Sequence, residues 1–307
     1  MQNTYLAAVS LGLGTVCVGG IYESIIGNIL GLPSTMFPVL AMPLGHSNFS
    51  YPSASPDYAT MTSDLPLVKY SNHTFEDALN SMLFAQSWSP QDLSTQELSQ
   101  LLWAGYGYSN TTHRTTPSAY DVYPLKILVL NATGVYGFTP ENHSVTKMYV
   151  GDTEIPLGDK RLDVANACNG QTLAANAPAL FLVVFNSTLG GECDTTENHK
   201  YIEIDAGCVA QQLLLEASAW NLSGNIIGEG LQQDQNGTKI WNETGAQQVR
   251  DALGGLDSSL VPLYAVPIGA SADRYLVARG TDDGIYCRQF NTTASSWGGF
   301  RKVARVH

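Results

Sequence analysis

The sequence contains few charged residues. Asp, Glu, Lys and Arg make up 14% of its 307 residues, against roughly a quarter in typical soluble proteins. The formal net charge is −12, and the basic residues do not cluster anywhere along the chain. Binding to a nucleic-acid backbone depends on clustered Lys and Arg side chains, so this composition excludes a nucleic-acid partner.

Long apolar runs and metal-binding spacings are also missing. No run reaches the roughly 18 apolar residues that a membrane span requires, so we expect no span. Residues 1–20 are apolar but lack a basic leader, and we expect them to belong to the fold rather than to a signal peptide. The six histidines are scattered, which predicts no metal site. The sequence contains five cysteines, and it does not decide between two alternative disulfides, Cys168–Cys193 or Cys193–Cys287.

Asn-X-Ser/Thr sequons are abundant. They include ten of the 18 asparagines, where chance would give about three. We therefore predict an extracellular or cell-surface glycoprotein; the alternative is a surface rich in Ser, Thr and Asn with accidental sequons. The sequon asparagines are Asn48, Asn72, Asn110, Asn131, Asn142, Asn186, Asn221, Asn236, Asn242 and Asn291.

The chain contains an internal repeat. Residues 210–228 align with residues 1–19, and residues 255–269 align with residues 31–45. The offset between the copies grows along the alignment, which predicts an insertion around residues 231–245 of the second copy. Each copy has the pattern of a helix, a buried strand, a short helix and a second buried strand.

Capping and periodicity signals predict the remaining elements. Ser94 and Glu97 form a capping-box pattern before a helix, and Thr74 with Asp77 forms a weaker one. We expect helices at residues 22–30, 161–168 and 204–220, and strands at residues 15–18, 36–44, 125–130, 134–139, 147–150, 179–185, 274–278 and 285–289.

Three motifs resemble the nitroreductase family, in particular its two-domain azoline-dehydrogenase-like branch. Residues 93–107 (LSTQELSQLLWAGYG) resemble the branch helix LS-x-x-ELSQLLWAAYG. Residues 113–119 (HRTTPSA), followed by YPL at 123–125, resemble its RT-x-PSAGALYPLE loop. Each repeat copy resembles the half that begins AQNLLLAAxALGLGT. The motifs occur in the order that the family has.

The resemblance implies a fold and a division of the chain. The fold is α+β, with a central, mostly antiparallel sheet flanked by helices. Family members form a dimer or pseudo-dimer with flavin mononucleotide (FMN) at the interface. Residues 1–47 correspond to the back half of one such unit, 48–70 to a linker, and 71–307 to a complete unit.

The family's flavin site is altered in this sequence. The family holds the flavin phosphate with an Arg-Arg-Ser-x-Arg-x-Phe motif, whose guanidinium groups match phosphate in charge and shape. Residues 82–88 stand at those positions and contain no basic residue. We therefore expect no bound cofactor, with FMN as the alternative. The degenerate cofactor positions are Met82, Leu83, Phe84, Gln86, Ser118, Ala119, Tyr120 (a glycine in the family), Asn221 and Ser223.

Other candidate catalytic residues have weak patterns. Ser118 lacks a surrounding Gly-x-Ser-x-Gly motif and is expected to start a loop rather than to act as a nucleophile. Asp205 and Glu216 are too far apart on one predicted helix to form a carboxylate pair. For Arg114, a hydrogen bond that anchors its loop and contact with a ligand both stay open. We predict no catalytic residue.

Two functional hypotheses follow. The first is a non-catalytic, extracellular structural protein that assembles with itself into a filament or sheath through residues 1–47. The second is an FMN-dependent oxidoreductase with an altered flavin site. The missing arginines and the sequons favour the first, and the resemblance over most of the chain favours the second, although fold alone is a weak argument for activity.

Overall fold

The computed structural model describes residues 1–46, 65–69, 73–109, 113–151, 153–195, 198–235, 238–272, 274–279, 284–291, 296–297 and 301–305. The structural statements below concern these residues. Most of the expected linker, 48–70, lies outside them.

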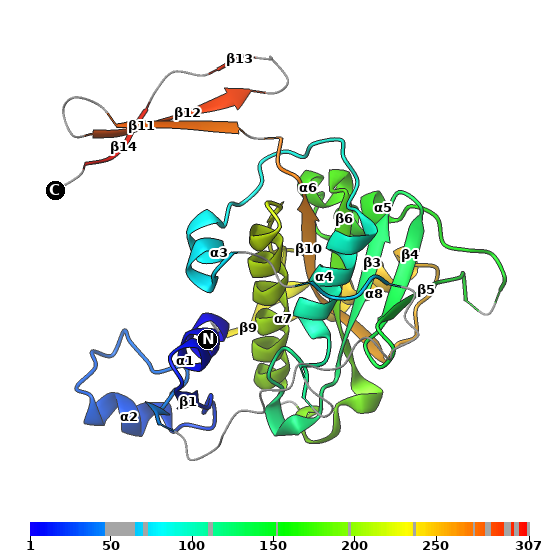
Figure 1. The fold of residues 1–307 in the computed structure, drawn as a ribbon. Helices are drawn as coiled ribbons and strands as arrows, with labels where there is room; N and C mark the ends of the chain where they lie inside the picture. The colour runs from blue at the N-terminus through cyan, green and yellow to red at the C-terminus, as the bar shows by residue number, and fades with distance from the viewer. Residues whose placement is uncertain are drawn as a thin grey trace.

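Helices and strands are interspersed along the described residues up to α8, and only strands follow it (Figure 1). The helices are α1 Gln2–Ser10, α2 Glu23–Ile29, α3 Phe75–Ser81, α4 Thr95–Tyr106, α5 Arg161–Ala167, α6 Thr172–Asn176, α7 His199–Ala219 and α8 Glu243–Ala252. The strands are β1 Gly14–Thr15, β2 Leu44–Gly45, β3 Leu125–Asn131, β4 Gly134–Thr139, β5 Ser144–Lys147, β6 Ala179–Asn186, β7 Ser223–Gly224, β8 Gln232–Gln235, β9 Thr238–Trp241, β10 Leu260–Gly269, β11 Arg274–Arg279, β12 Gly284–Asn291, β13 Ser296–Trp297 and β14 Arg301–Arg305.

A central sheet organises the described residues. Its strand order is β5-β4-β3-β6-β10-β7, and neighbouring strands run antiparallel. Strand β6 is buried along its whole length, and its side chains alternate between two cores. Phe181 and Phe185 enter the core under α4 and α7, while Leu180 and Leu182 enter the core under α5 and α8. This burial on both faces explains the uninterrupted apolar sequence of β6.

Helices cover both faces of the sheet (Figure 1). Helix α7 lies along one face with α4 beside it, and α5 and α8 lie on the other. The observed α+β fold with a central antiparallel sheet confirms the expected fold class. Strands β11, β12, β13 and β14 form a separate sheet near the C-terminus.

Two predicted helix starts are confirmed by their capping bonds. The Ser94 hydroxyl accepts the Glu97 N–H, and the Glu97 carboxylate accepts the Ser94 N–H. Thr74 and Asp77 make the same reciprocal pair at α3. Each pair satisfies two backbone donors that a helix N-terminus would otherwise leave open, so a shorter Asp replaces Glu without loss of the motif.

The two repeat copies pair in the same register. In the first copy Gly14 lies opposite Gly45, and a bridge joins Val18 to Ala41. The aligned residues of the second copy repeat both pairings, Ser223 with Gly269 and Ile227 with Ala265. The repeat seen in the sequence is therefore also a repeat of backbone hydrogen bonding. The predicted insertion contains the β8–β9 hairpin.

The first copy differs from the second in burial. Residues 36–44, predicted to form a buried strand, contribute only an isolated bridge at Ala41 and the start of β2. Met36 and Phe37 are 61% and 65% exposed. In the second copy, the aligned strand β10 pairs with β6, and most of its residues are buried. No described strand takes the place of β6 beside the first copy, so the prediction of a buried strand there was wrong.

Three further expectations are corrected. The strand expected at 147–150 ends at Lys147, because Ser144–Lys147 pairs with β4 immediately after the turn. Helix α7 begins at His199, five residues earlier than expected. Cys168 and Cys193 are both free and lie in different cores, which excludes a bridge between them. The side chain of Cys287 lies outside the described residues.

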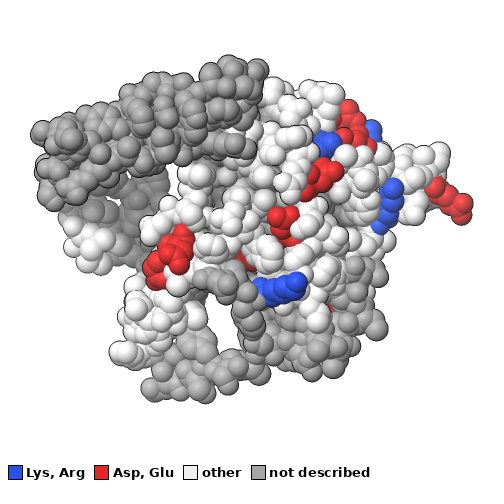
Figure 2. All heavy atoms as spheres, turned by 45° about the horizontal axis from the view of Figure 1, so that its top comes forward, with Lys and Arg blue, Asp and Glu red and all other residues white. Residues whose placement is uncertain are grey.

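The visible surface carries isolated charges. Figure 2 shows a few basic and acidic side chains among many uncharged residues, some of opposite sign in contact with each other, and no broad patch of one sign on that face. Among the described residues, no helix is long and apolar enough to cross a membrane.

Candidate functional site

The loop that resembles the family's Pro-Ser-Ala segment is anchored on helix α7. The Asp205 carboxylate accepts the main-chain N–H of Ala119 at 2.8 Å. The Ser118 hydroxyl oxygen accepts the N–H of Tyr123 at 2.9 Å, and the Cys193 thiol lies 3.5 Å from the Ala119 carbonyl oxygen as a donor. Ser118 therefore stabilises the turn that it starts, as its sequence context predicted.

The same loop holds side chains in a strained backbone conformation. Tyr120, Asp121 and Tyr123 have φ values of 56°, 59° and 52°. The left-handed region costs a residue with a Cβ roughly 1–2 kcal/mol, and such residues persist only where their surroundings enforce them. The hydrogen bonds from Ala119 to Asp205 and from Cys193 to Ala119 hold the loop in this conformation. The family's glycine at position 120 would take this conformation without strain.

Tyr120 and the first repeat copy both lie next to the same side chain, Tyr201 of α7. The Tyr120 ring packs edge-on against Tyr201, with ring centroids 5.9 Å apart. The Tyr201 ring in turn covers two glycines of the first copy: a Cβ added at Gly19 would lie 2.7 Å from its Cε1 atom, and one at Gly20 would lie 3.3 Å from its hydroxyl oxygen. Gly19, Tyr120 and Tyr201, far apart in sequence, thus form one junction, which we call the glycine–tyrosine junction.

Buried titratable groups surround the junction. Desolvation raises the pKa of Asp205 from 3.8 to about 7, although its bonds from Ala119 and Ser118 favour the charged form. Burial also raises the pKa of Cys193 to about 11 and that of Cys208 to about 12, so these thiols are protonated at neutral pH. Asp205 is therefore a carboxyl group that can hold or release a proton near neutral pH.

The positions that replace the phosphate motif lie elsewhere, beside the second repeat copy. Met82 packs against the core, whereas Leu83, Phe84 and Gln86 are exposed. The Asn225 side-chain amide donates to the Ala85 carbonyl oxygen at 3.3 Å, which joins this segment to the residues after β7. The expected cofactor positions therefore lie in two groups, residues 82–86 beside the residues after β7 and residues 118–120 beside α7.

Asn221 and Ser223 belong to the group beside the second copy. Asn221 has a φ of 57°, close to the 68° of the aligned Gly12. Asn is among the few residue types that tolerate this conformation, which explains how a glycine position can carry a sequon. Ser223 is buried in β7, and a Cβ added at its neighbour Gly224 would lie 2.6 Å from the end of the Leu214 side chain, which would have to shift.

The described sequons differ in accessibility. Asn142 and Asn221 are exposed, and Asn131 and Asn242 are half-buried. Asn186 is only 5% exposed, and its side chain accepts from both the N–H and the hydroxyl of Thr188, so the observed conformation leaves no room for a glycan there. The side chain of Asn291 is outside the described part, as are Asn48, Asn72, Asn110 and Asn236.

Arg114 anchors its loop through several contacts. Its guanidinium group forms an ion pair with Glu141 at 3.1 Å and donates to the Tyr106 carbonyl oxygen at 3.4 Å. It also stacks on the rings of Tyr106 and Tyr108, each with its centroid 4.6 Å from the guanidinium carbon. The anchoring role is therefore observed.

Sequence reasoning missed the residues that assemble the junction. It treated Asp205 only as a partner for Glu216 and did not consider Tyr201. The repeat alignment held the available signal, because it marked Gly19 as a fold position shared with Gly228. The contact of Gly19 with Tyr201 depends on tertiary packing. No group of three or more potential metal-binding side chains occurs in the described part of the chain.

Comparisons with known proteins agree with this geometry. The model of the nitroreductase family matches residues 1–46 and 86–270, which include both repeat copies and the loop. A candidate nitroreductase of Methanocaldococcus jannaschii is 27% identical over 174 residues, covering 54% of this chain and 84% of that protein.

Solved structures share the fold. A candidate nitroreductase from Anabaena variabilis superposes with a TM-score of 0.63 at 17% identity, covering 88% of this chain and 63% of its own. One from Ralstonia eutropha has a TM-score of 0.50 at 20% identity, covering 69% of this chain and 89% of its own. From the family match, the chain belongs to the nitroreductase family.

Proposed function

We propose that this protein is a flavin-dependent oxidoreductase whose flavin ring binds at the glycine–tyrosine junction. Membership of the nitroreductase family supports the oxidoreductase class, and the junction supplies the observation that carries the proposal. Bound flavin would provide the two-electron redox chemistry that amino-acid side chains lack. The comparisons favour this function over the structural role that the sequence suggested.

The junction fits a flat aromatic ring. The main chain at Gly19 and Gly20 is already in contact with the ring of Tyr201, because neither glycine has a side chain to keep it away. A flavin ring would take this surface once the Tyr201 side chain rotates aside. Asp205 would then fix the Ala119 N–H beside the ring and hold a proton close to it.

The phosphate end of FMN does not fit the expected positions. Residues 82–88 contain no cation, and a phosphate dianion requires charged donors. Near the junction, Lys200 lies at the start of α7 with its Nζ atom 5.4 Å from the centre of the Tyr201 ring. We infer that Lys200, rather than residues 82–88, faces the phosphate, which is the altered site that this function requires.

A pair of glycine substitutions tests the flavin site. Gly20→Ala would place a methyl group against the junction, whereas Gly27→Ala adds one where no atom lies within 4 Å. We expect FMN, followed by quenching of its fluorescence, to bind the wild type and Gly27→Ala alike and to bind Gly20→Ala at least about tenfold more weakly. Equal affinities for all three, or no binding by the wild type, would reject the junction as the flavin site.

A second candidate function is self-assembly on an extracellular surface. The exposed apolar side chains of residues 1–46 favour it, because exposed apolar patches of this kind mark interfaces. We propose that these residues are the back half of a second nitroreductase-like unit, as the shared register of the copies suggests. The exposed side chains are Val9, Leu11, Val16, Val18, Tyr22, Ile25, Ile29, Leu30, Met36, Phe37, Val39 and Leu44.

A further inference from the structure

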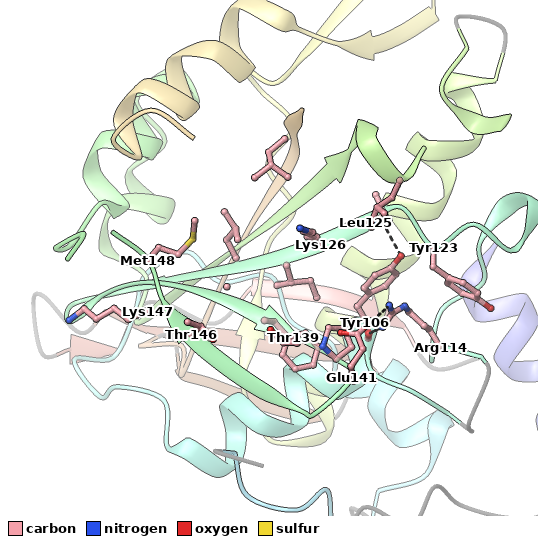
Figure 3. A pocket seen from close by; sticks show the side chains of 17 residues that line it. Tyr106, Arg114, Tyr123, Leu125, Lys126, Thr139, Glu141, Thr146, Lys147 and Met148 are labelled. Atoms are coloured by element: carbon pink, nitrogen blue, oxygen red, sulfur yellow. Dashed lines mark hydrogen bonds and ion pairs between the residues drawn. The ribbon is translucent and has the colours of Figure 1, made fainter. Parts of the chain in front are cut away.

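A separate pocket lies on the central sheet where β3 and β4 diverge (Figure 3). It has a volume of about 350 Å³ and is lined mainly by apolar surface. Gly137 forms part of the floor of the pocket, and the space next to it is unfilled: a Cβ added there would meet only the Leu128 side chain, at 3.9 Å. A cavity of this size and lining suits a small organic ligand.

The rim of the pocket is positively charged. Arg114, Lys126 and Lys147 line it, together with one acidic residue, Glu141. This local excess of positive charge occurs in a chain whose net charge is −12. Figure 3 shows Lys126 between the Arg114–Glu141 pair on one side and Met148 on the other.

Two of these cations have unused donor capacity. The Nε atom of Arg114 is buried and has no hydrogen-bond partner, although both terminal nitrogens are bonded. Lys126 is exposed, and its ammonium group makes no hydrogen bond or ion pair with the described residues. A carboxylate is the group that a charged donor such as the Lys126 ammonium binds most strongly.

We propose that this pocket binds a small carboxylate with a flat apolar body. The carboxylate pairs with Lys126 near the Arg114 end, and the apolar body lies over Gly137 and Leu128 towards Met148. The site is distinct from the glycine–tyrosine junction, and the proposal does not depend on flavin binding.

Titration with 2-naphthoate and its neutral isostere 2-naphthamide tests the proposal. Wild-type protein should bind 2-naphthoate more tightly than the amide. Lys126→Met should weaken 2-naphthoate binding about tenfold and leave amide binding unchanged. Gly137→Val, which fills the floor, should weaken both. Lys69→Met removes the same charge from an exposed site outside the pocket and should change neither.

Two outcomes of these titrations would contradict the proposal. The proposal fails if wild-type protein binds the acid no better than the amide, or if Lys126→Met binds 2-naphthoate like the wild type. Because Lys126 is exposed, its replacement should leave the fold intact, and a thermal melt would verify this. If Gly137→Val unfolds the protein, the comparison of Lys126→Met with the wild type is the decisive measurement.

Discussion

The carboxylate of Asp205 accepts the main-chain N–H of Ala119, and this bond joins the second turn of α7 to a loop of left-handed residues. The bond places a buried acid where its charge is only partly compensated. The conformation of the loop and the protonation of Asp205 are therefore coupled.

Stability should depend on pH through Asp205. Its pKa in the folded protein is about 7, above the unfolded value near 3.8. It therefore contributes stability that is complete below pH 4 and is lost as the pH rises through about 7. Compared with Asp205→Asn, the wild type should lose about 2–3 kcal/mol of unfolding free energy between pH 5 and pH 8.

Urea unfolding of both proteins at the two pH values measures this effect. Glu203 and Glu216 also have raised pKa values because they are buried, but both remain in the variant, so the difference isolates Asp205. Parallel pH dependence of the two proteins would show that Asp205 does not titrate in this range.

Replacing Tyr120 with glycine should favour flavin binding. The substitution restores the family residue, relieves a left-handed tyrosine and removes one wall of the junction. We expect FMN affinity to rise about tenfold, measured by fluorescence quenching. Tyr149→Gly, at another exposed tyrosine, serves as the control. An unchanged affinity for Tyr120→Gly would argue against ring binding beside this loop.

The buried guanidinium of Arg250 should contribute strongly to stability. Arg250 is 2% exposed, pairs with Glu243 and donates to the Leu260 carbonyl oxygen at 3.3 Å. Arg250→Met should cost about 3 kcal/mol, because it removes the hydrogen bonds that this buried guanidinium donates to Glu243, Gln247 and the Leu260 carbonyl oxygen. Glu243→Gln keeps an acceptor at a mostly exposed position and should cost less than about 1 kcal/mol. Denaturant unfolding that gives equal losses would contradict this asymmetry.

Self-association should depend on the exposed apolar side chains of the first copy. Phe37→Glu should shift the chain towards monomer in sedimentation velocity, as should deletion of residues 1–47. Leu162→Glu, at an equally exposed leucine of α5, should not. A wild-type chain that sediments as a single monomer at micromolar concentration would rule out assembly through this surface.

Glycosylation should follow accessibility. If the chain enters a secretory pathway, Asn142 and Asn221 should carry glycans and Asn186 should not, because only Asn186 is buried. Site-resolved mass spectrometry of secreted protein measures this pattern. An intact mass equal to the bare 33.0 kDa chain would contradict the prediction.

The sequence predicted the elements whose signals are local. The Ser94–Glu97 capping box and the apolar run of β6 depend on neighbouring residues, and both were located correctly. The state of residues 36–44 was not predicted, because it depends on whether a partner strand is present. The junction was missed for a similar reason: Gly19 and Tyr201 meet only through packing of the first copy on α7.

The repeated register gives this chain a built-in comparison. The Leu13 N–H donates to Ala8 at 2.7 Å in one copy, and the aligned Leu222 N–H donates to Ala217 at 2.8 Å in the other. The local hydrogen bonds match, but the strands of the second copy belong to the central sheet, whereas those of the first copy pair only with each other. The difference in hydrogen-exchange protection between these two amides would report how much the sheet and its helices add to the stability of one turn.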